Sequence, residues 1–219
     1  MKTAKIEIFI QPLAQFITQQ KQDFENFAIF NQYKKDCIYT HRNQLLSAQL
    51  KQKIGSSDFA QTEYGKPYLP AFEHVYFNHS HSQKNYALAL SHQMKDLGVD
   101  LEDLDRKIRF EALAQHAFHP NELERWQELE QDKEYWFKVW TTKEAVLKAS
   151  GLGIRMNLNE LDTQVDALNN GGVCQHPLIG VFAYQNYTLP KCMLTVAWRS
   201  DLSCKGFALP RIELITTQP

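Results

Sequence analysis

The amino-acid sequence predicts an α+β protein built from two halves of similar content. Residues 5–10 alternate and are rich in isoleucine, as in a strand, and the segment 16–53 has apolar residues at helical spacing without glycine or proline. Further strands follow, and then helices and strands again. No linker rich in serine, glycine or proline separates the halves, so we expect them to pack tightly together.

In the first half, the segment 16–53 is expected to form two helices with a break near Tyr33. A turn is expected at 55–58, because it reads Gly-Ser-Ser-Asp, and an ordered loop at 65–70, because it contains glycine and two prolines. The apolar runs 75–77 and 86–90 predict two paired strands.

In the second half, the run 97–102 predicts a turn that leads into a strand. A helical stretch is expected over 110–150, and Gly151 and Gly153 end it. The runs 180–184 and 192–198 predict strands of an antiparallel sheet.

Composition excludes several classes of protein. The chain of 219 residues has 24 basic and 25 acidic side chains, a formal net charge of -1, whereas proteins that bind nucleic acids through phosphates carry a basic excess. The apolar run near the N-terminus is too short for a signal peptide, and no stretch reaches membrane-spanning length. We therefore expect a cytoplasmic protein with neither a nucleic-acid nor a membrane partner.

Two pairs of charged residues indicate a candidate catalytic site. Asp100 and Glu102 are two apart on an expected strand and project from the same face, where a hard cation such as Mg²⁺ would relieve their repulsion. Glu144 and Lys148 are four apart on an expected helix and lie side by side, where they could supply a third ligand and a phosphate contact. Taken alone, each pair is better explained as part of an ordinary charged surface.

Two further segments are suited to a phosphorylated ligand. The Ser80 hydroxyl and a ring nitrogen of His81 are hydrogen-bond donors for phosphate at the end of a strand. His79 and His81 could also be zinc ligands, but no third nitrogen or sulfur ligand lies at a recognisable spacing. The loop Gly65-Lys66-Pro67 allows close backbone approach and is stiff, which suits the wall of a base-binding pocket and equally a plain turn.

Taken in order, these segments form a recognisable set. The motifs are GKP, then F-N-x-S-H-S, then G-V-D-L-E, and finally W-x-x-K-E-A-x-x-K-x-x-G-x-G. This set, over residues 62–154, resembles the 4′-phosphopantetheinyl transferases, in particular the monomeric, pseudo-dimeric Sfp-type branch. The resemblance implies two halves related by a pseudo-twofold axis, 1–98 on the side of the coenzyme A adenine and 3′-phosphate and 99–219 with the metal and catalytic helix. It also implies an active site at their interface.

The resemblance also implies a role for particular residues. Mg²⁺, or Mn²⁺, would be held by three carboxylates, those of Asp100, Glu102 and Glu144. Lys148 would contact the phosphates near the reacting phosphorus, and Ser80 the pyrophosphate. The remaining coenzyme A contacts would be His81, Arg42, Lys34 and Lys35 at the 3′-phosphate and Gly65, Lys66 and Pro67 at the adenine. His79 replaces the usual aliphatic residue of its motif, and we expect it to change packing more than chemistry.

The expected reaction follows from the same resemblance. The 4′-phosphopantetheine arm of coenzyme A would move to a serine of an acyl or peptidyl carrier protein, releasing 3′,5′-ADP, with catalysis by positioning and charge neutralisation. The serine proton would go to Glu122, to Glu144 through a water, or to a water held by the metal, and the sequence does not choose among them. Two alternatives are a non-catalytic module that binds coenzyme A or a nucleotide, and a zinc hydrolase.

Overall fold

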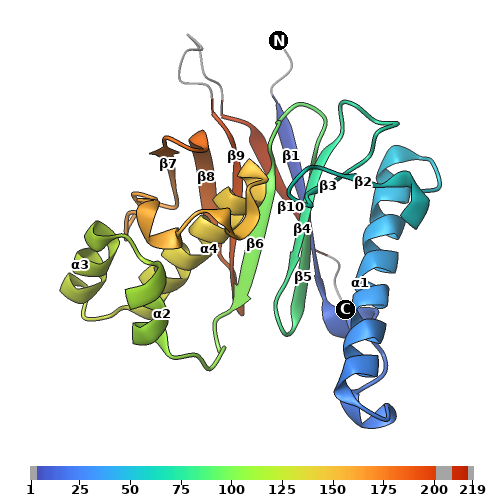
Figure 1. Ribbon diagram of the computed structural model, residues 1–219, viewed down its shortest axis with the longest axis horizontal. Coiled ribbons are helices and arrows are strands. Elements are labelled where there is room, and N and C mark those ends of the chain that lie inside the picture. The colour runs from blue at the N-terminus through green and yellow to red at the C-terminus, as the bar shows by residue number, and fades with distance from the viewer. Residues whose placement is uncertain (1–3, 201–208, 217–219) are drawn as a thin grey trace.

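The computed structural model describes residues 4–200 and 209–216, and it confirms a mixed α+β fold. Two four-stranded sheets lie next to each other in the middle of the molecule, with one long helix, α1, on the outer side of the first sheet and α2, α3 and α4 on the outer side of the second (Figure 1). The architecture is therefore helix, sheet, sheet and helices.

The first sheet contains both ends of the described chain. Its order is β10-β1-β5-β4, with bounds Arg211–Thr216, Lys5–Pro12, Asn85–Ser91 and Tyr76–His81. The pairs β1–β5 and β4–β5 are antiparallel, whereas β10 runs parallel to β1. The predicted pairing of the strands near 75 and 86 is confirmed. The short hairpin of β2 (Ala60–Gln61) and β3 (Pro67–Tyr68) lies in the connection between α1 and β4.

Helix α1, Phe27–Leu50, is continuous, so the predicted break near Tyr33 is wrong. The segment has no glycine or proline to interrupt the backbone ladder, and the helix begins instead at Asn26, whose side chain accepts a hydrogen bond from the Ile29 N–H at 3.0 Å. The residues before it form short 3₁₀ turns. The 3₁₀ turns of the described chain are Leu13–Gln15, Lys21–Asp23, Ser56–Asp58, Gly153–Arg155 and Leu158–Glu160.

The second sheet is antiparallel throughout. Its order is β6-β9-β8-β7, with bounds Gly98–Asp103, Cys192–Arg199, Gly180–Thr188 and Gly171–His176. The helical stretch expected over 110–150 is divided into α2 (Phe110–Ala117), α3 (Pro120–Glu128) and α4 (Lys133–Ser150). Helix α3 starts at Pro120, because proline at the first helical position loses no hydrogen bond. Gly151, in the left-handed conformation at φ 76°, ends α4 as predicted.

Three groups of buried apolar side chains fill the spaces between the four layers. One lies between α1 and the first sheet, one between the second sheet and the helices that cover it, and the third between the two sheets. The third group includes residues of both sheets, among them Ile6, Ile8, Leu101, Val196 and Trp198. The division into 1–98 and 99–219 stays a prediction, and strand β10 near the end of the chain lies in the first sheet.

Strand β6 and helix α4 approach each other unusually closely at Gly98. A Cβ atom at this position would lie 2.1 Å from the Ala145 carbonyl oxygen and 2.4 Å from the Ala149 amide nitrogen. Only glycine therefore permits this contact, which brings the residues that follow it on β6 next to the last turns of α4. Within the described part of the chain, no helix is long and apolar enough to cross a membrane.

Candidate active site at the seam between the sheets

Strands β4 and β6 are end strands of different sheets, and they lie side by side. Ser80 on β4 donates a hydrogen bond to Asp100 on β6, with 2.8 Å between Oγ and Oδ1. Lys148 on α4 completes the group, because its Nζ lies 2.6 Å from Asp100 Oδ1 and 2.8 Å from Ser80 Oγ. Three residues that the sequence singled out from three separate motifs therefore meet at one point, which we call the seam.

The seam has an excess of carboxylate charge. Burial, and then the charge of Asp100, raises the pKa of both Glu102 and Glu144, so the three carboxylates predicted as metal ligands influence one another. Asp100 is 5% exposed, and its Oδ2 atom is buried without a hydrogen-bond partner. Glu102 is turned toward Arg106 four residues further on, with which it forms an ion pair.

These carboxylates fit a hard cation in their chemistry, although their side chains are not gathered around one point. In the described residues, no three histidine, cysteine, aspartate or glutamate side chains are arranged so that they could hold a metal ion. The fit rests on the unpartnered Asp100 oxygen and on three oxygen ligands without sulfur or nitrogen, the donor set typical of Mg²⁺ and Mn²⁺.

A basic cavity of about 520 Å³ opens beside the seam, between α1 and β4. Lys34 and Lys35 of α1 line it together with His81 and Lys148, so it suits an anionic group. Burial lowers the pKa of His81 and of Lys34 from their ordinary values, since the charged forms lose hydration there. With Ser80, which also lines the cavity, the structure thus brings together five of the residues predicted to bind coenzyme A.

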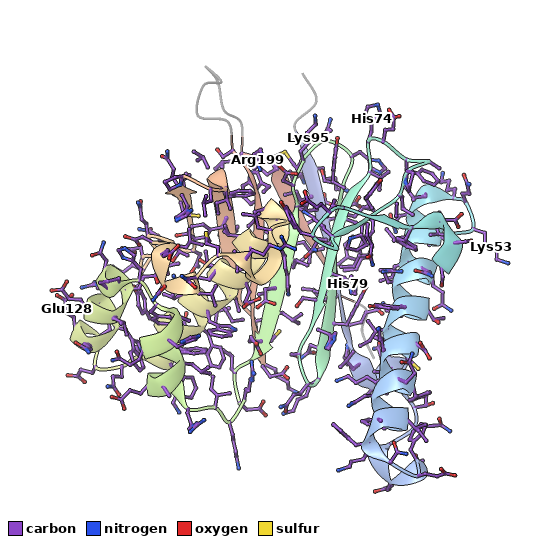
Figure 2. The ribbon with its side chains drawn as sticks, in the orientation of Figure 1. Lys53, His74, His79, Lys95, Glu128 and Arg199 are labelled. Atoms are coloured by element: carbon purple, nitrogen blue, oxygen red, sulfur yellow. The ribbon has the colours of Figure 1, made fainter. Side chains whose placement is uncertain are left out.

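His79 is placed by packing. It lies on β4 on the side that faces α1 (Figure 2), between Tyr39 at 6.1 Å and Tyr86 at 5.8 Å between ring centroids. Burial lowers its pKa to about 3, so the ring is neutral, and its Nδ1 atom has no hydrogen-bond partner. Tyr39 also lines the basic cavity, and sequence reasoning missed it, although it is four residues beyond Lys35 on the same helix face.

Arg42 does not line the cavity itself, but it packs against Tyr39, which does. Its guanidinium carbon lies 3.9 Å from the centroid of the Phe59 ring and 4.8 Å from that of Tyr39. The Nε and Nη2 atoms donate hydrogen bonds to Asn43 Oδ1, at 3.1 and 2.9 Å. The guanidinium therefore stacks between aromatic rings, an arrangement that favours arginine. Contact of Arg42 with a 3′-phosphate stays a prediction.

A second cavity, of about 230 Å³, lies on the other side of Lys148. Gly65, Lys66 and Pro67 line it together with Glu144 and Lys148. The side chain of Lys66 crosses from this loop to α4, where its Nζ donates to the Ala149 carbonyl at 2.7 Å. Because the ammonium group of Lys66 is used in this way, a ligand in the cavity would contact only the aliphatic part of the Lys66 side chain and the Lys66 backbone.

Glu122 is not at the seam. It is 2% exposed, and its two oxygens accept hydrogen bonds from the His119 N–H at 2.8 Å, the Thr163 N–H at 2.9 Å, the Thr163 hydroxyl and Lys143 Nζ at 2.7 Å. A carboxylate has about four lone-pair sites, and all are used here. Through Lys143, Glu122 joins α3 to α4, and its role as a base stays a prediction.

Fold and site together describe an α+β protein in which a basic cavity and a group of carboxylates meet between two sheets. Residues 96–192 match the sequence profile of the 4′-phosphopantetheinyl transferase superfamily. This segment of the chain is therefore similar to that superfamily.

Named relatives agree with this assignment. The chain is 39% identical over 115 residues to the 4′-phosphopantetheinyl transferase HetI of Nostoc sp., 31% over 109 residues to a 4′-phosphopantetheinyl transferase of Bacillus subtilis, and 27% over 123 residues to Sfp of Bacillus subtilis strain 168. These alignments cover 50%, 49% and 55% of this chain and 48%, 47% and 53% of the respective relatives. The chain thus matches about half the length of these relatives.

Proposed function

We propose that this chain is a 4′-phosphopantetheinyl transferase of the Sfp type, which acts as a monomer in the cytoplasm. It would move the phosphopantetheine arm of coenzyme A to a serine of a carrier protein and release 3′,5′-ADP. The observation that supports this most is the contact of Ser80, Asp100 and Lys148 between two cavities. The two halves of one chain supply both sides of the seam, so the site does not require a second copy.

The two cavities divide the proposed coenzyme A contacts. The 3′-phosphate would bind in the basic cavity with Lys34, Lys35 and His81, and the adenine in the cavity walled by the loop 65–67. Lys148 lines both cavities, so its ammonium group would neutralise charge on the pyrophosphate that connects these two ends. The Ser80 hydroxyl, 2.8 Å from Lys148 Nζ, is placed for the same pyrophosphate.

Asp100, Glu102 and Glu144 would hold Mg²⁺, or Mn²⁺. When bound, the ion would stabilise the charge that develops on the transferred phosphoryl group. Of the two carboxylates considered as a base, only Glu144 lines a cavity together with Lys148, so we place the transfer of the serine proton at Glu144, through a water.

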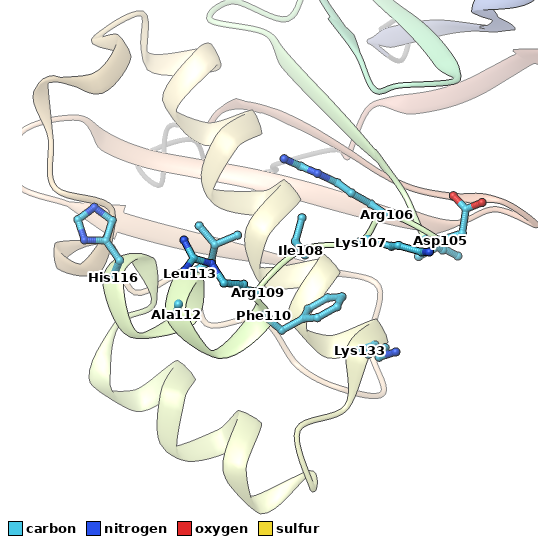
Figure 3. A pocket seen from close by; sticks show the side chains of 11 residues that line it. Asp105, Arg106, Lys107, Ile108, Arg109, Phe110, Ala112, Leu113, His116 and Lys133 are labelled. Atoms are coloured by element: carbon cyan, nitrogen blue, oxygen red, sulfur yellow. The ribbon is translucent and has the colours of Figure 1, made fainter.

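A groove of about 1020 Å³ on the second half suits the carrier protein. It is formed by the segment after β6, by α2 and by the start of α4 (Figure 3), and its lining includes Asp105 and Arg106, the latter being the ion-pair partner of Glu102. It combines the basic side chains of Arg106, Lys107, Arg109 and Lys133 with the apolar ones of Ile108, Phe110 and Leu113. Carrier proteins are acidic helical bundles, so the charges are complementary.

The experiment that tests this function is the transfer of a labelled pantetheine arm from coenzyme A to an apo carrier protein. We expect transfer with Mg²⁺, none with EDTA, and recovery when Mg²⁺ is restored, because the ligands proposed are hard oxygen donors. Binding of coenzyme A without any transfer would favour the non-catalytic module instead. Full activity after removal of metal would contradict the proposed ligand set.

A further inference from the structure

Among the described strand pairings, β4 pairs with β5 and β6 pairs with β9, so no backbone ladder connects β4 to β6. Side chains connect these two strands instead. Asn78 Oδ1 accepts a hydrogen bond from the Val99 N–H at 2.9 Å. Ser80, two residues on, donates to Asp100, and Ser82, two residues further, donates to Asp103 Oδ1 at 2.8 Å. Alternate residues of β4 and of the turn after it therefore fix the position of β4 along β6.

Asp103 makes the largest contribution to this arrangement. It is 2% exposed, and its Oδ1 accepts from Ser82 Oγ at 2.8 Å and from Asn85 Nδ2 at 2.7 Å. Its Oδ2 accepts from the N–H groups of Gln83 and Lys84, both at 3.1 Å. Four donors from one turn satisfy this buried charge, so none of its capacity is left for a ligand.

The turn held by Asp103 begins directly after Ser80 and His81, two of the residues that line the basic cavity. Ser80 and His81 are the last residues of β4, and the turn 82–85 follows them. Asp103 is also the last residue of β6, three positions after Asp100. Its hydrogen bonds therefore fix the strand that contains Ser80 and His81 against the strand that contains Asp100.

We propose that Asp103 is a positioning residue, which holds Ser80 and His81 at the distance from Asp100 and Lys148 that phosphate binding requires. This inference rests on the function proposed above, and it adds a residue that the motifs do not contain. Asp103 touches no ligand and acts through the turn. Displacements of about 1 Å are sufficient to impair such sites strongly.

The test compares Asp103→Asn with the wild type by calorimetric titration with coenzyme A and with dephospho-coenzyme A. An amide has one acceptor oxygen, and its NH₂ group would face the donors of the turn, so Ser80 and His81 are expected to shift. The Kd for coenzyme A should rise by about tenfold or more, because contacts with a charged phosphate weaken. The ratio of the Kd for dephospho-coenzyme A to the Kd for coenzyme A should fall toward one, since His81 no longer binds the 3′-phosphate.

Two further variants make the result decisive. Lys84→Ala changes the same turn and removes the exposed ion pair with Asp105, but it keeps the backbone N–H that Asp103 accepts, so the ratio should stay at the wild-type value. Ser82→Ala removes one donor to Asp103 and should lower the ratio less than Asp103→Asn does. If Asp103→Asn does not fold, Ser82→Ala still tests the role of Asp103.

An unchanged ratio in Asp103→Asn and Ser82→Ala, whatever their melting temperatures, would show that Asp103 serves the fold alone and would overturn the inference. A wild type that binds neither ligand would overturn the proposed function, and this inference with it.

Discussion

Lys148 is the residue in which the contacts of the site converge. Its amine donates to Ser80 and to Asp100, and its side chain, 29% exposed, lines both cavities. A surface ion pair would contribute at most about 1 kcal/mol to folding and nothing to catalysis. The position of Lys148 between a buried carboxylate and two cavities instead predicts that its charge acts on a ligand.

Removal of this charge should therefore affect the rate of transfer much more than stability. In single-turnover transfer to a carrier protein, Lys148→Ala and Glu144→Gln should each lower the rate by roughly a hundredfold or more, the usual loss when one preorganised electrostatic group is removed. Thermal unfolding of the same variants should change little.

Lys138→Ala is the matched control on the same helix. Lys138 is 2% exposed and donates to the Ala167 carbonyl at 3.0 Å, so its loss should lower the melting temperature and leave the rate of the folded protein near that of the wild type. If Lys148→Ala and Glu144→Gln transfer the arm at the wild-type rate, Lys148 and Glu144 contribute only to the fold.

His81 allows a separate test of the basic cavity. If it binds the 3′-phosphate with Lys34 and Lys35, the wild type should bind coenzyme A more tightly than dephospho-coenzyme A, because charge-assisted hydrogen bonds are lost with the phosphate. His81→Ala should narrow this difference, as measured by titration calorimetry. Equal affinity of the wild type for both ligands would contradict the placement of the phosphate.

That Ser80, Asp100 and Lys148 serve one site could be anticipated from the ordered motifs, whereas strand and helix periodicities alone relate only neighbours on one element. The environment of Glu122 could not, since its partners Lys143 and Thr163 come from other elements. A carboxylate in a helix-opening motif looks the same in sequence whether it is saturated or free.

At the scale of elements, the loop 62–68 is attached to the end of α4. Lys66 donates to the Ala149 carbonyl, one of the last four carbonyls of the helix, which have no partner within it. Arg155, just beyond α4, lies over the Tyr64 ring at 4.4 Å from its centroid. These two contacts hold the wall of the proposed adenine cavity against the helix that contains Glu144 and Lys148.

The buried amine of Lys66 makes this attachment dependent on pH. Burial lowers its pKa from 10.5 to about 8, so between these values the unfolded chain binds more protons than the folded protein, and stability rises with pH. The difference in the free energy of unfolding, wild type minus Lys66→Met, should therefore increase by on the order of 1 kcal/mol from about pH 8 to about pH 10.5. Urea unfolding of both proteins across this range gives the difference directly.

This difference should be constant below about pH 8, where Lys66 is charged in both states. A difference that does not change between pH 8 and pH 10.5 would mean that the amine is not buried against α4.

Sequence patterns predicted most elements but missed those that depend on distant pairing. The strands near 5, 75, 86 and 192 and the end of α4 are confirmed. Strands β7 and β10 were not predicted, and β10 is stabilised by its parallel pairing with β1, about two hundred residues earlier. The division of the stretch 110–150 into three helices depends on Pro120 and on the Asp132 side chain, which accepts from the Tyr135 N–H at 2.7 Å.

At the scale of the whole molecule, the two sheets share one layer of buried side chains. Ile6 and Ile8 of the first sheet belong to the same core cluster as Val196 and Trp198 of the second, and each is at most 1% exposed. Neither sheet can be removed without exposing the inner face of the other. The chain should therefore unfold as one cooperative unit, whatever the boundary between its halves.

The positions of the tryptophans make this prediction measurable. All four, at 126, 136, 140 and 198, lie in the second half, so their fluorescence reports mainly on that half. Ile8→Ala changes the first sheet and should destabilise the protein by about 2–5 kcal/mol, because it leaves a cavity in the shared layer. The shift in melting temperature should be the same by tryptophan fluorescence as by far-ultraviolet circular dichroism, which includes α1. Ile29→Ala, at an exposed position of α1, should shift neither signal appreciably. A fluorescence transition that stays at the wild-type temperature in Ile8→Ala would show that the second half folds independently, and that the packing between the sheets does not couple them.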